Sequence, residues 1–151
     1  MSTATMAHVY PIDREELFAF LADPANLPRY YNGIVDLTVP ARFTEPGDEV
    51  TFRYRVLGRT VDARARLLDR DPGVRLRTRS EADGIPSVEH DWHHEDVDEG
   101  TRVTVTMATD GVDSWFGRAI DRLVLPRHLE KDLARSLENI EELVALGFDR
   151  S

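Results

Sequence analysis

The chain has no cysteine and almost no lysine, since Lys131 is the single lysine among 19 basic residues. Without cysteine, disulfide bonds and thiolate chemistry are excluded. No apolar run approaches the roughly 20 residues that a membrane-spanning helix needs, and residues 1–9 lack the positive start and apolar stretch of a secretory signal. We therefore expect a cytoplasmic protein that does not insert into membranes.

Positive charge is also scarce, with 28 acidic residues and a net charge of −9. Nucleic-acid binding needs a cationic surface that replaces the counterions of the phosphates, so we expect no nucleic-acid partner. Docking on anionic membranes is disfavoured for the same reason. The chain is 41% hydrophobic and 31% charged, which is typical of a folded domain with a substantial core. Its length predicts a single domain over residues 1–151.

The strongest pattern in the chain is an amphipathic helix over residues 114–147. Apolar side chains recur every three or four positions, at Leu129, Leu133, Leu137, Ile140 and Val144. Pro126 removes one helical hydrogen bond and is expected to divide the pattern into pieces over 114–125 and 126–146. The charged residues between the apolar positions, Asp132 among them, predict a solvent-exposed face.

Two short helices are expected after a first strand over residues 2–10. Asp13 is the candidate N-cap of the first helix, and Glu16 three residues later would complete a capping box. The pair Asp23-Pro24 predicts the cap and first position of a second helix, which Pro28 limits.

Six further strands are predicted, joined by short turns. Alternation is clearest over residues 50–56, where apolar residues alternate with Thr51, Arg53 and Arg55. The other strands are predicted at residues 34–43, 61–67, 74–80, 87–96 and 101–109. Short connections predict an antiparallel meander whose apolar face is covered by the C-terminal helix. Arginines and acids of the central strands should form an exposed outer face with cross-strand ion pairs.

Four segments together resemble a known superfamily: the helical residues 11–23 and 23–30, the strand pair 92–104, and the terminal helix 129–143. In this order and spacing they resemble the START/Bet v 1-like superfamily, also called SRPBCC, and within it the polyketide cyclase/dehydrase group. The resemblance implies an α+β helix-grip fold, a seven-stranded antiparallel sheet curved around a long C-terminal helix, with two short helices after strand 1. It also implies a pocket for an apolar or aromatic small molecule between sheet and helix.

The segment 88–95 is the most unusual, because it holds three histidines around Trp92. Strand alternation puts His90, Trp92 and His94 on one face. Trp92 matches the inward tryptophan of the superfamily, so both histidines should point inward, where they would contact a ligand or transfer a proton. The alternative is that both histidines lie near the cavity rims and form hydrogen bonds within the protein, without contact to a ligand. His90 and His94 lie roughly 13 Å apart along a strand, so they cannot share one ion, and we expect neither a metal nor another cofactor.

Several other residues are candidates for ligand contact. Tyr30 and Tyr31, where the second helix meets the sheet, would stack on a ligand, donate a hydroxyl to it or close the core. Tyr54, inward on its strand, would bond to a ligand or to another side chain. Trp115 would form part of a lid or of the core. The remaining candidates are Met107, Leu133 and Leu137.

Three functions stay open at this point. The leading hypothesis is a stand-alone domain that binds one hydrophobic, lipid-like or aromatic small molecule. The first alternative is a metal-free polyketide cyclase or dehydratase that uses His90 or His94 as general acid or base. The second is a protein-interaction module of the co-chaperone kind, whose core would be filled. The sequence leaves the ligand and the number of subunits open, a homodimer included.

Overall fold

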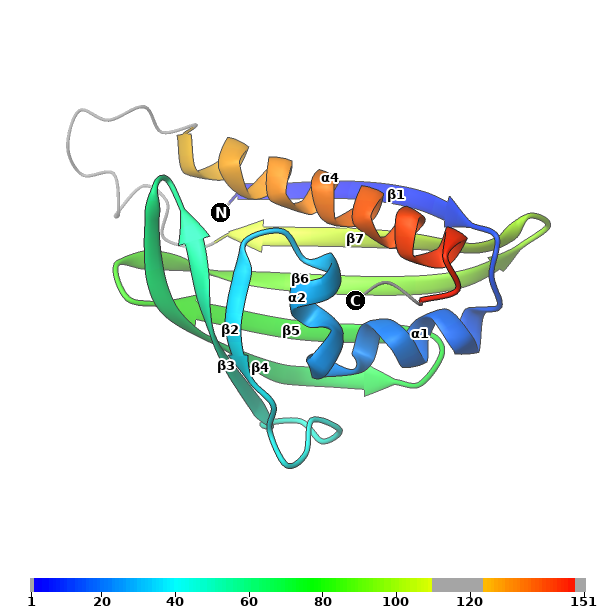
Figure 1. Cartoon of the computed structure of the whole chain (residues 1–151), viewed down its shortest axis with the longest axis horizontal. Coiled ribbons are helices and arrows are strands. Elements are labelled where there is room, and N and C mark those ends of the chain that lie inside the picture. The colour runs from blue at the N-terminus through cyan, green and yellow to red at the C-terminus, as the bar shows by residue number, and fades with distance from the viewer. Residues whose placement is uncertain (1, 110–123, 149–151) are drawn as a thin grey trace.

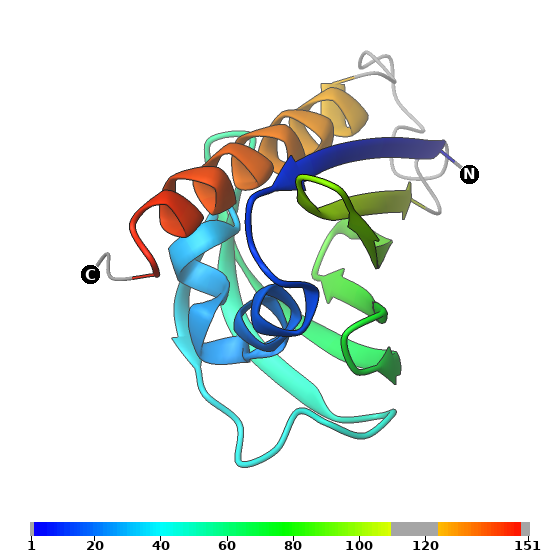
Figure 2. The ribbon, with the colours of Figure 1, turned by 90° about the vertical axis from the view of Figure 1, so that its right-hand side faces the viewer.

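The structure, a computed structural model, describes residues 2–109 and 124–148. Within these residues the sheet and the helices form two layers, with the helices on the concave face of one curved sheet (Figure 1, Figure 2). The elements are β1 (Ser2–Tyr10), α1 (Arg14–Ala22), the 3₁₀ turn η1 (Pro24–Asn26), α2 (Leu27–Tyr30), β2 (Ile34–Thr38), β3 (Glu49–Val56), β4 (Arg59–Asp71), β5 (Arg75–Ala82), β6 (Ile85–Val97), β7 (Gly100–Thr109) and α4 (Val124–Ala145).

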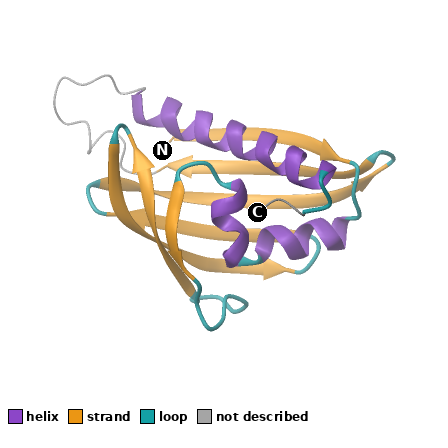
Figure 3. Cartoon of the chain, in the orientation of Figure 1, coloured by secondary structure: helices purple, strands orange, loops and turns teal. Residues whose placement is uncertain are grey.

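The sheet has seven antiparallel strands in the order β1-β7-β6-β5-β4-β3-β2 (Figure 3). Strands β2 to β7 form the predicted meander, and β1 joins its far edge by pairing with β7 from Ser2↔Thr109 to Tyr10↔Thr101. The helix-grip fold predicted from the sequence is therefore confirmed.

Several strand boundaries differ from the prediction. The largest extension is in β4, which runs from Arg59 to Asp71 instead of over residues 61–67. β2 ends at Thr38 instead of residue 43, because its pairing with β3 shifts register between Val35 and Thr38 and Pro40 brings no backbone donor to a sheet. β6 is longer than predicted, running from Ile85 to Val97.

Helix α1 and the turn η1 begin at residues whose side chains cap them. Asp13 caps α1 as predicted, since its carboxylate accepts hydrogen bonds from the amides of Glu15 and Glu16. Asp23 caps η1 through the amide of Ala25. Pro28 does not limit the second helix: it lies in the first turn of α2, where the missing N–H has no intrahelical partner to lose.

The terminal helix α4 contradicts two details of the prediction. Within the described residues Pro126 does not break it, because α4 is helical on both sides of Pro126, from Val124 to Ala145. Asp132 does not lie on the solvent-exposed face, since it is only 5% exposed. The predicted leading piece lies mostly outside the described residues, and Trp115 lies entirely outside them.

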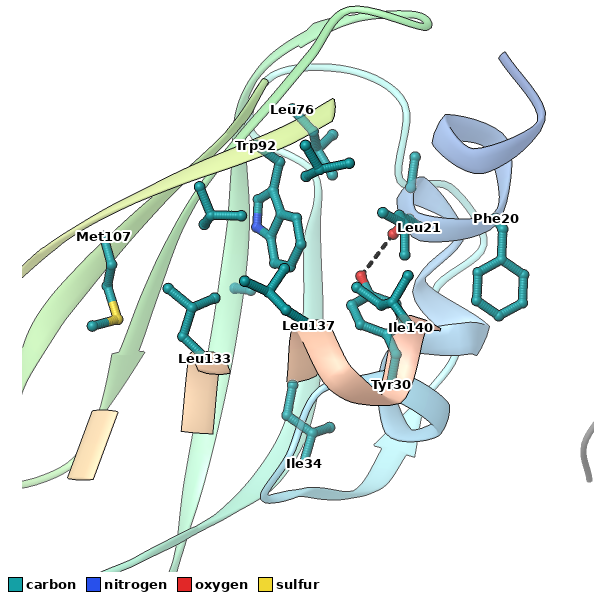
Figure 4. Close-up of a cluster of buried hydrophobic side chains, with 14 of the residues drawn as sticks. Phe20, Leu21, Tyr30, Ile34, Leu76, Trp92, Met107, Leu133, Leu137 and Ile140 are labelled. Atoms are coloured by element: carbon teal, nitrogen blue, oxygen red, sulfur yellow. Dashed lines mark hydrogen bonds between the residues drawn. The ribbon is translucent and has the colours of Figure 1, made fainter. Parts of the chain in front are cut away.

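The core fills the space between α4 and the sheet. Figure 4 shows Trp92 of β6 and Met107 of β7 pointing into this space, together with Leu133, Leu137 and Ile140 of α4. The hydroxyl of Tyr10 donates a hydrogen bond of 2.9 Å to the carbonyl oxygen of Leu137 and so ties the helix to β1.

The outer face of the sheet carries the predicted cross-strand ion pairs. Examples are Arg66 with Glu49, Arg64 with Glu81, and Arg75 with Asp91. Exposed pairs of this kind contribute at most about 1 kcal/mol each, so this face is mainly a solvated surface. None of the helices among residues 2–109 and 124–148 is long and apolar enough to cross a bilayer.

Candidate functional site

A cavity of about 100 Å³ lies on the concave face of the sheet. Its floor is formed by β3 to β6, and most of its roof by the segment from the end of α1 through α2. Of α4, only Leu129 lines it among the described residues. The cavity predicted between sheet and C-terminal helix therefore lies further toward the short helices than expected.

Apolar side chains form most of the cavity wall, including Phe43, Phe52, Leu76 and Trp92. The floor is widened by small residues, since Ala63, Ala65 and Ala82 point into it where larger side chains would fill it. An apolar cavity of 150 Å³ in an engineered protein stays dry and binds benzene, so the present volume is on the scale of one small ring.

The polar wall of the cavity is a hydrogen-bonded pair of one residue just after α2 and one in β6. Tyr31 follows α2, and its hydroxyl oxygen lies 2.7 Å from Nε2 of His90. The rings meet edge to face at 89° with centroids 5.4 Å apart. Because both residues line the cavity, the pair can offer hydrogen bonds to a bound molecule.

Burial keeps both members of this pair uncharged at neutral pH. Desolvation lowers the pKa of His90 to about 4, so the imidazole is neutral. Desolvation, with the negative charge of Asp132, raises the pKa of Tyr31 well above its usual value, so the phenol keeps its proton.

A second polar cluster surrounds Asp132 of α4, next to the cavity. The hydroxyl of Tyr54 donates a hydrogen bond to Oδ2 of Asp132, and the side-chain amide of Asn32 donates one of 2.7 Å to Oδ1. Nε2 of His128 lies 3.2 Å from Oδ2, but not in hydrogen-bond geometry. The hydroxyl of Ser136 accepts a hydrogen bond of 2.8 Å from the backbone N–H of Asn32.

A glycine allows this cluster to form. Gly33 has a φ of 98°, and a Cβ there would meet the Tyr54 ring at 2.7 Å. Any side chain would therefore displace the ring that carries the hydroxyl to Asp132. Desolvation is the main reason why the pKa of Tyr54 is raised far above its usual value.

The structure brings some of the predicted ligand residues together and separates others. Tyr30, Tyr54, His90 and Trp92 line the cavity. Tyr30 already uses its hydroxyl, which donates a bond of 2.8 Å to the carbonyl oxygen of Leu21 (Figure 4). The candidates that are buried without being among the lining residues are His94, Met107, Leu133 and Leu137.

His94 occupies a separate buried position beneath α1. It is 3% exposed, and its ring packs edge-on against Phe18 with centroids 5.2 Å apart. Neither ring nitrogen has a hydrogen bond of good geometry, although the backbone of Trp92 and Val74 lies close enough to favour protonation. Burial outweighs this effect and lowers the pKa of His94 to about 4.

Sequence reasoning missed the burial of Asp132 and did not foresee that Tyr31 bonds to His90. A signal for Asp132 was present, because it lies three residues after Leu129 and four before Ser136, which places it beside the buried stripe of the helix. No comparable local signal marks the partners of Tyr31 and Tyr54, which are 59 and 78 residues away.

Among residues 2–109 and 124–148 no group of three or more His, Cys, Asp or Glu side chains could hold a metal ion. His90 and His94 point into different surroundings, His90 toward Tyr31 and His94 toward Phe18.

Comparisons with known proteins agree with this fold. The family described as "Polyketide cyclase / dehydrase and lipid transport" matches residues 1–145. No curated protein matches the sequence significantly.

Among solved structures, TTHA0849 from Thermus thermophilus is similar with a TM-score of 0.76 and 20% identity, over 97% of this chain and 99% of that one. CV1439 from Chromobacterium violaceum has a TM-score of 0.74 and 17% identity, over 95% and 98%. Ara h 8.0201 has a TM-score of 0.69 and 16% identity, over 95% and 97%. At these identities the likeness shows a shared fold.

Proposed function

The chain belongs to the polyketide cyclase/dehydrase and lipid-transport family, and from this premise we propose that it binds a compact hydrophobic or aromatic molecule in the cavity on the concave face of the sheet. The observation that carries the proposal is the cavity itself, about 100 Å³ in volume, walled by aromatic and aliphatic side chains and containing one polar pair. Burial of apolar ligand surface there would supply the driving force, at about 25 cal/mol per Å².

The test is native mass spectrometry of the freshly purified chain, with organic extraction of the bound material. We expect a mass above that of the chain alone and a small apolar compound in the extract. Ala65 is 7% exposed and lies in the cavity floor, so Ala65→Leu should fill the cavity and abolish the adduct. Ala41 lies in an exposed loop, so Ala41→Leu should retain it.

An apo mass that stays unchanged after incubation with toluene, phenols and short fatty alcohols would contradict the binding proposal. An adduct that survives Ala65→Leu in a folded protein would move the binding site elsewhere.

A second candidate function is acid–base catalysis on a polyketide-like substrate, and the Tyr31–His90 pair favours it. A phenol and a neutral imidazole 2.7 Å apart can donate and accept a proton during loss of water from a β-hydroxy ketone. The pKa of about 4 makes His90 a weak base near neutral pH, which is why binding is preferred as the main proposal.

Two histidine variants distinguish a catalytic function from simple binding. If the chain is an enzyme, dehydration of a β-hydroxy ketone surrogate should disappear in His90→Gln while ligand affinity is retained. His94→Gln should keep the rate, because His94 is not among the residues that line the cavity. The absence of any turnover in the unmodified chain would leave binding as the function.

A further inference from the structure

The cavity has an asymmetric chemistry that goes beyond general hydrophobic binding. One wall carries the hydrogen-bonding pair Tyr31 and His90, and the rest is mainly apolar. Building on the proposed function, we propose that the cavity selects an uncharged one-ring compound with a hydroxyl or carbonyl group directed at Tyr31 and His90, and rejects carboxylates such as free fatty acids.

The selection for a polar group follows from the hydrogen bonds that the pair leaves unused. If Tyr31 donates to Nε2 of His90, the proton of the neutral imidazole sits on Nδ1; if Nε2 donates to Tyr31, the phenolic proton is free. In both arrangements the pair retains one donor and at least one acceptor. A ligand hydroxyl or carbonyl can therefore be satisfied, whereas a purely hydrocarbon ligand leaves these groups without a partner.

The rejection of anions follows from the charges around the cavity. Among the described residues that line it, none is Lys or Arg, and Glu81 is the one formally charged residue. Glu81 is already paired with Arg64 at 2.7 Å. Asp132 lies close enough to raise the pKa of Tyr31, so its negative charge opposes a second one. A buried carboxylate without a cationic partner carries a large desolvation cost.

The other polar groups of the cavity fit the same ligand class. Thr78 lies opposite His90 in the β5–β6 register and also lines the cavity. Its hydroxyl adds a neutral donor and acceptor beside the imidazole. The polar end of the cavity thus consists of the neutral side chains of Tyr31, Thr78 and His90, which recognise a dipole better than a charge.

The test compares ligands that differ in one property, with dissociation constants measured by NMR titration of the ¹⁵N-labelled chain. Toluene and p-cresol differ in a hydroxyl, and benzamide and benzoate have the same shape but differ in charge. We expect p-cresol to bind about tenfold more tightly than toluene, the effect of a satisfied buried hydrogen bond. Benzamide should bind at least about tenfold more tightly than benzoate.

Two tyrosine variants connect the preference to the pair. Tyr31→Phe should reduce the preference for p-cresol over toluene, because one of the two polar partners is lost and His90 alone remains. Tyr30→Phe removes a hydroxyl that is already bonded to Leu21 and should keep the preference. If Tyr31→Phe does not fold, the affinities of the unmodified chain for the four compounds still test the inference.

The outcomes distinguish this inference from the proposed function. Equal affinities for toluene and p-cresol, benzamide that fails to bind, or benzoate that binds as tightly as benzamide would overturn the inference while hydrocarbon binding stands. Failure of all four compounds to bind would overturn the proposed function as well.

Discussion

Asp132 is the residue that joins the terminal helix to the strand beside the cavity. Its carboxylate accepts hydrogen bonds from Tyr54 and Asn32 and lies near His128. A buried carboxylate is retained at low energy only when such donors surround it. The cluster therefore holds Tyr54, a cavity-lining residue, in a defined position relative to α4.

Replacing Asp132 should destabilise the fold strongly. Asp132→Ala leaves the Tyr54 hydroxyl and the Asn32 amide without their partner, and we expect the free energy of unfolding to fall by about 3 kcal/mol. Glu138 lies on the same helix and pairs with exposed Arg135, so Glu138→Ala should change the free energy of unfolding by less than about 0.5 kcal/mol. Urea denaturation measures both, and equal effects would contradict the role given to Asp132.

His94 should make the folded protein sensitive to acid. Its pKa is about 4 in the folded chain against an ordinary value of 6.5, so the unfolded chain binds more protons between these two pH values. Stability is therefore fully present above about pH 6.5 and is lost as the pH falls toward 4. At 1.36 kcal/mol per pKa unit, the loss is of the order of 3 kcal/mol.

The variant His94→Leu tests this effect. Leucine is apolar and packs against Phe18 without a group that needs a proton or a hydrogen bond. We expect a shallower decline of stability between pH 6.5 and 4, measured by denaturation at several pH values. His90 has the same lowered pKa, so part of the decline should remain. A variant with the same pH profile as the unmodified chain would show that His94 titrates normally.

At the scale of elements, the β3–β4 hairpin contains a strained residue. Its two-residue turn consists of Leu57 and Gly58, with φ values of 48° and 77°, and positive φ at both positions is the requirement of a type I′ turn. Glycine adopts this conformation without penalty, but leucine does not. Leu57 is also 39% exposed, so little packing offsets the strain.

Relieving this strain should stabilise the protein. Leu57→Asn places a residue that tolerates the left-handed region in the preferred Asn-Gly turn, and we expect a gain of about 1 kcal/mol in unfolding free energy. Leu57→Ala keeps a Cβ in the same conformation and should gain little. Thermal and urea denaturation of the two variants provide the comparison, and a more stable alanine variant would argue against backbone strain.

The helices and strands show which local sequence signals are sufficient to predict secondary structure. The strand β3 and the capping role of Asp13 could be predicted from the sequence, because each depends on neighbours within a few residues. The prediction that Pro28 limits the second helix was wrong, since Pro28 lies in the first turn of α2, where a proline removes no intrahelical hydrogen bond. The Tyr31–His90 and Tyr54–Asp132 bonds were beyond local reasoning because they join distant segments.

At the scale of the whole molecule, one continuous core connects every layer of the described structure. Tyr10 of β1, Phe18 of α1, Trp92 of β6 and Leu137 of α4 belong to the same buried cluster. No boundary between separate cores is apparent in that cluster, so the single domain expected from chain length remains our prediction.

Such a core predicts cooperative unfolding. Sheet and helices should lose their structure in one step, because neither α4 nor the sheet can bury its apolar face alone. Far-UV circular dichroism should therefore report the same urea midpoint as near-UV circular dichroism, which follows aromatic packing. Separate midpoints would mean that α4 or another part unfolds independently.

The small residues of the cavity floor have an evolutionary consequence. Ala63, Ala65 and Ala82 lie on paired strands, away from the residues of the polar pair. A single-base change from alanine to valine at one of these positions would add two methyl groups and shrink the cavity. A change to glycine would remove a methyl group and enlarge it. Descendants of this chain could thus drift between ligands of different size while inheriting the same preference for a polar group.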